Sequence, residues 1–207
     1  MIFRRLFVLS ALALPLFFTA YADDNSADAK PAPATVLFNG TDLTGWKPGK
    51  EPNIHWKVAD GILTGENDPE KKGSMLYTVK SYANFEFEAE ARWNGEIDSG
   101  FMMRKPELQL QIGVSRSLKK DMTGSFYVGN YPEEGQAKEA AKVIKTGDWN
   151  QFKLKMSGDT CTVWINGTEV SRFTDKKYAA PGPIGLQIHP GLAMKVEFRA
   201  IKIKELE

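Results

Sequence analysis

The clearest pattern in the chain is a strict alternation of apolar and charged residues over residues 84–93. The apolar positions are Phe85, Phe87, Ala89, Ala91 and Trp93, and the charged positions between them are Glu86, Glu88, Glu90 and Arg92. A repeat of two places successive side chains on opposite faces of a β-strand. The segment therefore predicts an antiparallel strand with one face in a core and the other in water.

Similar short strands recur along most of the chain, separated by turn residues. They are predicted at residues 35–38, 55–58, 61–64, 74–78, 125–128, 150–157, 160–165, 169–173, 185–189 and 195–206. Asp60-Gly61 and Asn166-Gly167 have the composition of tight hairpin turns. Residues 133–143 are the only helical candidate, and Gly135 limits them to a turn or two. Without a rhythm of alternating strands and helices, the chain is predicted to be all-β, a sandwich of two antiparallel sheets.

The last predicted strand changes register along its length. Val196 and Phe198 set one phase of the alternation, and Ile201 and Ile203 set the opposite phase. One extra residue in the strand restores the burial of all four side chains. A β-bulge is therefore expected close to residues 199–200.

The stretch DSGFMMRKPELQLQI, residues 98–112, carries the densest candidate chemistry. It predicts two strands, residues 99–104 and 107–112, that meet at Lys105-Pro106, because proline cannot donate to a central ladder. Alternation places Pro106, Leu108, Leu110 and Ile112 on one face and Glu107, Gln109 and Gln111 on the other. The second face suits a hydroxyl-rich ligand, with Arg104 nearby as a cation. The alternative is an ordinary solvated sheet face.

Residues 1–22 have the features of a cleaved signal peptide. Arg4 and Arg5 precede an apolar run, and Ala20 and Ala22 supply the small residues that signal peptidase reads. The run is short for a membrane span. A polar, proline-bearing leader is expected at residues 23–34, followed by a single domain at residues 35–207. The mature protein is thus expected in the periplasm or outside the cell, with no membrane span.

Charge and cysteine content exclude several classes of protein. The signal peptide holds two of the 27 basic residues and none of the 26 acidic ones, so the remainder is nearly neutral. Such a balance argues against nucleic acid as a partner. Cys161 is the single cysteine, so an internal disulfide is excluded, and its alternation with Val163 and Ile165 indicates a core position. No cluster of metal-ligand type is visible, and no cofactor is expected.

Several phrases, taken in order, resemble the 3-keto-disaccharide hydrolase domain family. They are LFNGTDLTGW at residues 37–46, WKVADG at 56–61, DSG at 98–100 with Arg104, TGSFY at 123–127, GDWN at 147–150, WING at 164–167, GPIGLQIH at 182–189 and VEFRAI at 196–201. The resemblance implies a concanavalin A-like jelly roll whose concave sheet receives carbohydrate. It also implies exported proteins that act on oxidised sugars or other glycans.

One departure from the family pattern bears on the chemistry. Many relatives carry Glu-x-Gln-Ile/Val-x-Asp where this chain has residues 107–114. Aligning on Glu107 puts Ile112 at the position of the Asp, and aligning on Gln111 puts Gln109 and Val114 at the two acidic positions. Hydrolysis by the usual route needs two carboxyl groups. A two-carboxylate mechanism therefore loses support.

The candidate catalytic residues are Glu107, His189 and Arg104. His189 shares a strand face with Gln187 and is suited to proton transfer at neutral pH. Arg104 offers a planar fork for a carboxylate or a ketone oxygen. Each has a plainer alternative: a solvated acid for Glu107, a strand-end histidine before Pro190, and a structural ion pair for Arg104.

The candidate substrate-binding residues surround this set. They are Gln109, Gln111, Tyr127, Gln187 and Asp121. Asp121 lies in the loop after the glutamine-bearing strand and, as the nearest acid downstream, is the candidate to replace the missing carboxylate. Ser115, Arg116 and Ser117 in the same loop are expected at a pocket rim.

Three functions remain open from the sequence, although no residue pattern speaks for the third, a scaffold or interaction domain in a larger envelope assembly. The first is an exported enzyme that cleaves a glycoside oxidised at C3, in which a base removes the proton beside the ketone and the leaving sugar is eliminated. The second is a non-catalytic carbohydrate-binding module with the same polar face. Neither the sugar nor any protein partner can be named from the residues.

Overall fold

A computed structural model describes residues 33–49, 52–67 and 69–207 of the chain. The predicted signal peptide lies outside the described residues, as does the predicted leader apart from residues 33 and 34. Within the described ranges, no helix has the length and apolar character required to cross a membrane.

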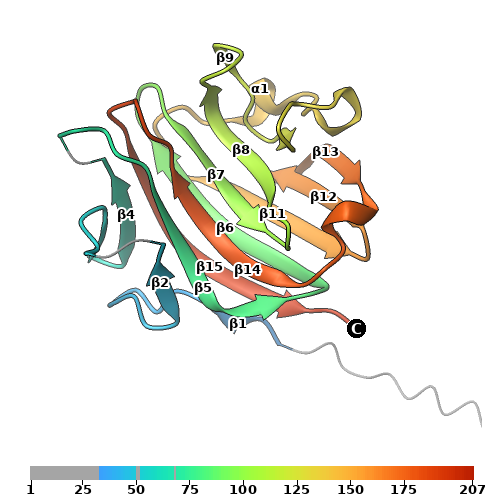
Figure 1. Ribbon diagram of the computed structural model, residues 1–207, viewed down its shortest axis with the longest axis horizontal. Coiled ribbons are helices and arrows are strands. Elements are labelled where there is room, and N and C mark those ends of the chain that lie inside the picture. The colour runs from blue at the N-terminus through green and yellow to red at the C-terminus, as the bar shows by residue number, and fades with distance from the viewer. Residues whose placement is uncertain (1–32, 50–51, 68) are drawn as a thin grey trace, which may run out of the picture. The chain divides into compact units, whose positions relative to one another are not determined.

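Two antiparallel sheets account for the strands of the described residues (Figure 1). The eight-stranded sheet contains β1 (Thr35–Val36), β3 (Trp56–Ala59), β4 (Ile62–Glu66), β6 (Phe85–Trp93), β11 (Asn150–Ser157), β12 (Thr160–Ile165), β13 (Thr168–Thr174) and β15 (Lys195–Glu205). The seven-stranded sheet contains β2 (Trp46–Pro48), β5 (Ser74–Tyr82), β7 (Asp98–Met103), β8 (Leu108–Ser115), β9 (Lys120–Asp121), β10 (Phe126–Tyr127) and β14 (Gly182–Ile188). This is the jelly-roll sandwich that the sequence predicts.

The helical content is small and sits in connections. A 3₁₀ turn (η1, Glu133–Gly135) and one helical turn (α1, Ala140–Val143) occupy the predicted helical segment, and a second 3₁₀ turn (η2, Lys176–Tyr178) precedes β14. The prediction of at most a turn or two is confirmed. Two short strands, β2 and β9, formed where turns or loops were expected.

The core lies between the facing sheets and is rich in phenylalanine. The side chain of Phe101 in β7 points towards the eight-stranded sheet. Its ring centroid lies 5.2, 5.5 and 5.9 Å from the ring centroids of Phe87, Phe152 and Phe198, respectively. All four side chains are almost fully buried. Full burial of such a side chain stabilises the fold by about 1.5–3 kcal/mol. Because burying the apolar side chains of β6 stabilises the fold, the face of β6 that carries them is the one packed against the seven-stranded sheet.

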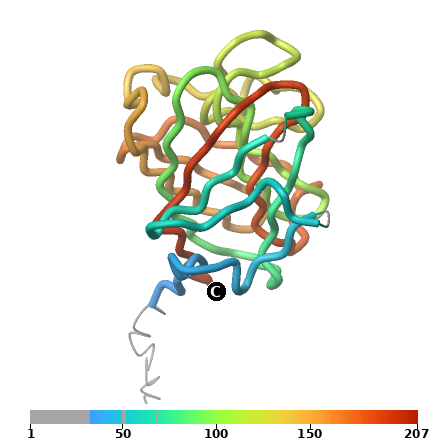
Figure 2. Tube along the Cα trace, turned by 90° about the vertical axis from the view of Figure 1, so that its left-hand side faces the viewer, coloured from blue at the N-terminus to red at the C-terminus, as the bar shows by residue number. Residues whose placement is uncertain are grey.

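The long C-terminal strand ties the eight-stranded sheet together. β15 pairs with β6 along one edge and with β4 and β1 along the other, and Figure 2 shows the teal β3–β4 hairpin beside the red C-terminal strand. Its pairing with β6 shifts between Arg199 and Lys202, and Ala200 has a positive φ of 52°. The predicted bulge is confirmed.

Candidate functional site

Strand pairing in the seven-stranded sheet brings the predicted polar residues onto one outer face. Gly100 of β7 lies opposite Gln111 of β8 on one side and opposite Gln187 of β14 on the other. A Cβ at Gly100 would come within 2.6 Å of the Leu110 carbonyl oxygen and 3.3 Å of the Gln109 side chain. Glycine at this position therefore leaves room for the amide side chains to meet across β7.

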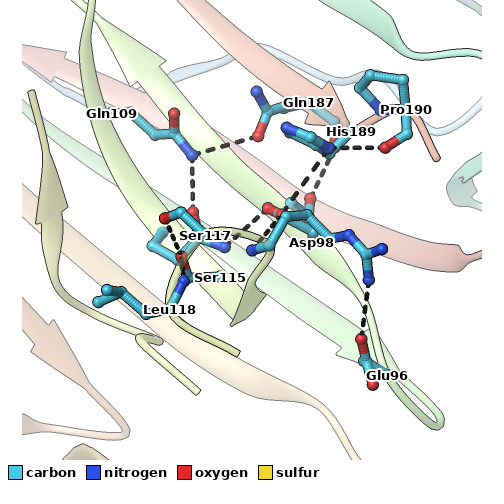
Figure 3. Close-up of polar contacts among 12 residues, drawn as sticks. Glu96, Asp98, Gln109, Ser115, Ser117, Leu118, Gln187, His189 and Pro190 are labelled. Atoms are coloured by element: carbon cyan, nitrogen blue, oxygen red, sulfur yellow. Dashed lines mark hydrogen bonds and ion pairs between the residues drawn. The ribbon is translucent and has the colours of Figure 1, made fainter. Parts of the chain in front are cut away.

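The amide side chains form a chain of hydrogen bonds that ends on a carboxylate (Figure 3). Gln109 Nε2 donates to Gln111 Oε1 at 2.8 Å and to Gln187 Oε1 at 3.3 Å. Gln111 Nε2 then donates to Asp98 Oδ1 at 2.9 Å, and the Arg116 backbone N–H donates to Asp98 Oδ2 at 3.1 Å. Each amide is thereby held in a defined orientation.

His189 lies directly after β14, at the edge of this network. Its Nδ1 is 2.8 Å from the carbonyl oxygen of Pro190 and 3.9 Å from Asp98 Oδ2. A carbonyl only accepts hydrogen bonds, so Nδ1 carries the proton and the neutral ring has its lone pair on Nε2. The His189 side chain is 37% exposed, whereas that of Asp98 is 5% exposed. The unprotonated Nε2 of this partly exposed ring is therefore suited to accept a proton from a ligand.

These side chains line a cavity of about 230 Å³ on the outer face of the sheet. Its lining residues are Asp98, Gln109, Gln111, Ser115, Arg116, Ser117, Tyr127, Tyr131, Gln187 and His189. Ser115, Arg116 and Ser117 are thus at the cavity, as the sequence predicts for that loop. The mixture of amides, hydroxyls, an imidazole and a carboxylate suits a ligand rich in hydroxyl groups.

Two tyrosines form the aromatic wall of the cavity. The ring centroids of Tyr127 and Tyr131 are 5.0 Å apart. Burial raises the pKa of Tyr131 to about 12, although a hydrogen bond with Ser115 opposes the shift. The Tyr131 hydroxyl therefore keeps its proton at neutral pH and can donate it in a hydrogen bond.

Glu107 occupies a second cavity beside the first. This cavity, of about 310 Å³, shares Gln109, Tyr127 and Gln187 with the first and also contains Met75 and Lys177. The Tyr77 hydroxyl of β5 donates to Glu107 Oε1 at 2.5 Å. Glu107 and His189 are thus on the same sheet face, but in adjoining hollows rather than one.

The position of Arg104 differs from the sequence-based expectation that it would lie beside the polar face. It has a positive φ of 70°, which ends the alternation of β7. Its side chain is 1% exposed, donating to the carbonyl oxygens of Ala179 at 2.8 Å and Gly158 at 2.7 Å. The guanidinium is therefore a structural group away from both cavities, and it does not bring a cation to the polar face.

Asp121 is also placed elsewhere. Its Oδ1 accepts hydrogen bonds from the backbone N–H of Thr123 at 2.8 Å and from the Thr123 hydroxyl at 2.6 Å. It lines a separate hollow with Ser125 and Gln136. Asp121 therefore caps a turn and does not replace the missing carboxylate at the polar face.

The sequence patterns did not indicate three residues of the site, Asp98, Tyr131 and Tyr77. Asp98 has the same phase as Gly100 and Met102, so counting the alternation back from the glutamine face would have found it. Tyr77 and Tyr131 come from distant segments, and no local pattern links them to the glutamines. Among the described residues, no group of three or more His, Cys, Asp or Glu side chains is arranged to hold a metal ion.

The fold and the polar face define a concanavalin A-like jelly roll of the carbohydrate-active type. The model of the 3-keto-alpha-glucoside-1,2-lyase-like domain matches residues 33–204. The chain belongs to this family. It matches none of the curated proteins.

Solved structures show where else this fold occurs. A candidate glycosyl hydrolase from Parabacteroides distasonis shares 24% identity, with a TM-score of 0.64 over 84% of this chain and 94% of that one. The family GH16 endo-β-1,3(4)-glucanase SCLam shares 13% identity, with a TM-score of 0.55 over 86% and 91% of the two chains. The carbohydrate-binding module CBM66 from Bacillus subtilis shares 13% identity, with a TM-score of 0.52 over 78% and 96%. At such low identity these likenesses show the fold alone.

Proposed function

We propose that this protein is an exported enzyme that cleaves a glycoside oxidised at C3 of its sugar. The observation that carries the proposal is the imidazole of His189, which lines a cavity floored by amides and a buried carboxylate and whose Nδ1 contact with the Pro190 carbonyl leaves Nε2 unprotonated. The family's description, a 3-keto-alpha-glucoside-1,2-lyase-like domain, supports the same reaction class. Export rests on the signal-peptide pattern of residues 1–22.

The reaction begins with removal of a proton. A ketone at C3 makes the C2 proton acidic, and His189 Nε2 accepts it while the electron pair moves onto the C3 oxygen as an enolate. Tyr131 and Tyr127 line the cavity, and their hydroxyls are the donors for that oxygen. A preorganised donor at a developing negative charge commonly contributes on the order of a hundredfold or more to rate.

The second half of the reaction releases the leaving sugar. The enolate electrons re-form the ketone, the C2 electron pair forms a C1–C2 double bond, and the C1–O bond breaks towards oxygen. The imidazolium returns its proton to that oxygen, so the elimination is balanced. Later addition of water across C1–C2 would give the same products as hydrolysis. A disaccharide would place its two rings in the adjoining cavities, with Gln109 and Gln187 between them.

A carbohydrate-binding module is the second candidate function. The observation that favours it is the separation of the acids, because Glu107 and Asp98 line different cavities. A pair of carboxyl groups facing one glycosidic bond is the usual arrangement for direct hydrolysis. The elimination route needs a single base, so it does not depend on that pair.

The deciding experiment compares turnover with binding. Wild type, His189→Gln and the matched control His55→Gln are tested on plain and 3-keto disaccharides. We expect wild type to cleave only the keto substrate, and His189→Gln to lose about a hundredfold or more in kcat while still binding it. His55 is buried against the Glu66 carbonyl outside the cavity, so its variant should keep kcat.

Two results would contradict the proposal. Wild-type turnover by His189→Gln removes the imidazole from the mechanism. Binding of sugars by the wild type without turnover of any keto substrate identifies a binding module instead.

A further inference from the structure

Asp98 is a buried carboxylate that the proposed reaction has not used. It opens β7 with its side chain on the outer face, at the floor of the cavity that contains His189. Both of its oxygens accept hydrogen bonds, one from Gln111 and one from the Arg116 backbone. These donors are neutral, so both oxygens have partners but neither partner supplies a positive charge.

The negative charge of Asp98 acts on two ionisable side chains at the cavity, Tyr131, whose pKa it helps to raise, and His189. Within the described ranges, His189 is the only group that forms an ion pair with Asp98, at 3.9 Å between Nδ1 and Oδ2. The other charged side chain at the cavity is Arg116, whose Nη1 pairs with Glu96 at 3.3 Å. The carboxylate is therefore available to interact with the imidazole.

The backbone fixes the distance between the two residues. The His189 N–H donates to the Asp98 carbonyl oxygen at 3.2 Å, which ties the end of β14 to the start of β7. Gly113, opposite Asp98 on β8, has a φ of 89°, and a Cβ there would lie 2.2 Å from the Ile97 carbonyl oxygen. This close approach lets Val114 N–H bond the same oxygen at 2.7 Å and holds the start of β7 in place.

We propose that Asp98 is the positioning residue of His189. With the Pro190 carbonyl, it holds the imidazole proton on Nδ1, leaves Nε2 as the base, and stabilises the imidazolium that forms when Nε2 accepts a proton. The stabilisation of the imidazolium rests on the proposed function. The assignment of the proton to Nδ1 in the neutral ring does not depend on the proposed function.

The tautomer is measured directly by nuclear magnetic resonance of ¹⁵N-histidine protein. The chain has two histidines, so two sets of ring signals are expected. At alkaline pH, where both rings are neutral, wild-type His189 should show the Nδ1–H form. In Asp98→Asn the Nδ1–H population of His189 should fall, while the ring signals of His55 in the same protein should stay unchanged. In the matched control Asp121→Asn, the signals of both histidines should equal those of the wild type. An Nε2–H ring in the wild type, or an unchanged tautomer in Asp98→Asn, would overturn the proposal.

Kinetics on a 3-keto disaccharide provide the second readout. Because Asp98 acts through His189, we expect Asp98→Asn to lower kcat about tenfold to a hundredfold with KM within about threefold. Asp121→Asn should retain wild-type kcat. A fall that appears in KM alone would contradict a positioning role.

A double variant separates positioning from stability. In Asp98→Asn one carboxylate oxygen becomes an amide N–H₂, which then faces another donor, either Gln111 Nε2 or the Arg116 N–H. Two facing donors cannot form a hydrogen bond, so this variant should lose thermal stability. Adding Gln111→Glu supplies an acceptor and moves the charge to β8, so thermal stability should recover while kcat stays low. Recovery of kcat with stability would show that the position of the charge is unimportant. If the wild type turns over no keto substrate, the proposed function fails, and the tautomer measurement still decides the role of Asp98.

Discussion

The hydroxyl of Tyr77 donates to Glu107 Oε1 at 2.5 Å and joins β5 to the turn between β7 and β8. Burial, followed by the hydrogen bond and the negative charge of Glu107, raises the pKa of Tyr77 well above its usual range. The phenol therefore remains a donor, and it holds an otherwise exposed carboxylate in one orientation at the second cavity.

We expect Glu107 to act in binding rather than in proton transfer, because it lies outside the cavity of His189. Glu107→Gln keeps the shape and an acceptor for Tyr77, so it should weaken sugar binding by about 1 kcal/mol and leave kcat nearly unchanged. Calorimetric binding and single-turnover kinetics on a 3-keto disaccharide measure the two effects. A loss of about a hundredfold in kcat would instead make Glu107 the proton-transfer group.

Arg104→Ala tests the structural role of the buried guanidinium. The change removes two hydrogen bonds to carbonyl oxygens and leaves a cavity, so the free energy of unfolding should fall by about 2–5 kcal/mol. Urea unfolding measures this, and kcat measured below the transition should match the wild type. If Arg104→Ala instead lost turnover while keeping the stability of the wild type, Arg104 would have a role in the reaction.

The tyrosines predict a loss of stability at alkaline pH. The pKa of Tyr131 is raised to about 12, and those of Tyr77 and Tyr82 are also raised, with burial as the largest cause in each case. The unfolded chain releases these protons near pH 10, the ordinary pKa of a tyrosine, before the folded protein does. Stability from these groups is therefore complete below pH 10 and falls as the pH rises towards 12.

Urea unfolding between pH 8 and pH 11 measures this slope. Tyr131→Phe removes one of the shifted groups, so its free energy of unfolding should decline less steeply than that of the wild type over the same range. Equal slopes for the two proteins would show that Tyr131 titrates alike in the folded and unfolded states.

Cys161 should be unreactive in the folded protein. Its side chain is fully buried and donates to Met103 Sδ at 3.8 Å, and burial raises its pKa to about 12 despite the nearby charge of Arg104. An aromatic disulfide reagent at pH 8 should detect no thiol in the native protein and one per chain after unfolding in guanidinium. Rapid labelling of the native protein would mean that the sandwich opens near β12.

Local sequence determined most of the architecture. The alternation in residues 84–93 specified β6 and its buried face, since a period of two leaves a strand only one way to bury its apolar side chains. The two opposed registers in residues 195–206 specified the bulge for the same reason. Turn residues such as Asn166 and Gly167 adopt positive φ angles, which end the strand before them. The hairpin turn therefore lies where the sequence predicted it.

The composition of the site was decided by tertiary structure. Alternation alone put Gln109 and Gln111 on one face, but only the order β8–β7–β14 brings Gln187, His189 and Asp98 beside them. Likewise, the positive φ of Arg104 turned its side chain from the polar face to carbonyl groups that a periodic pattern does not reveal. A strand's period fixes which side of a sheet a residue occupies. Which residues meet there depends on strand pairings made between segments far apart in the chain.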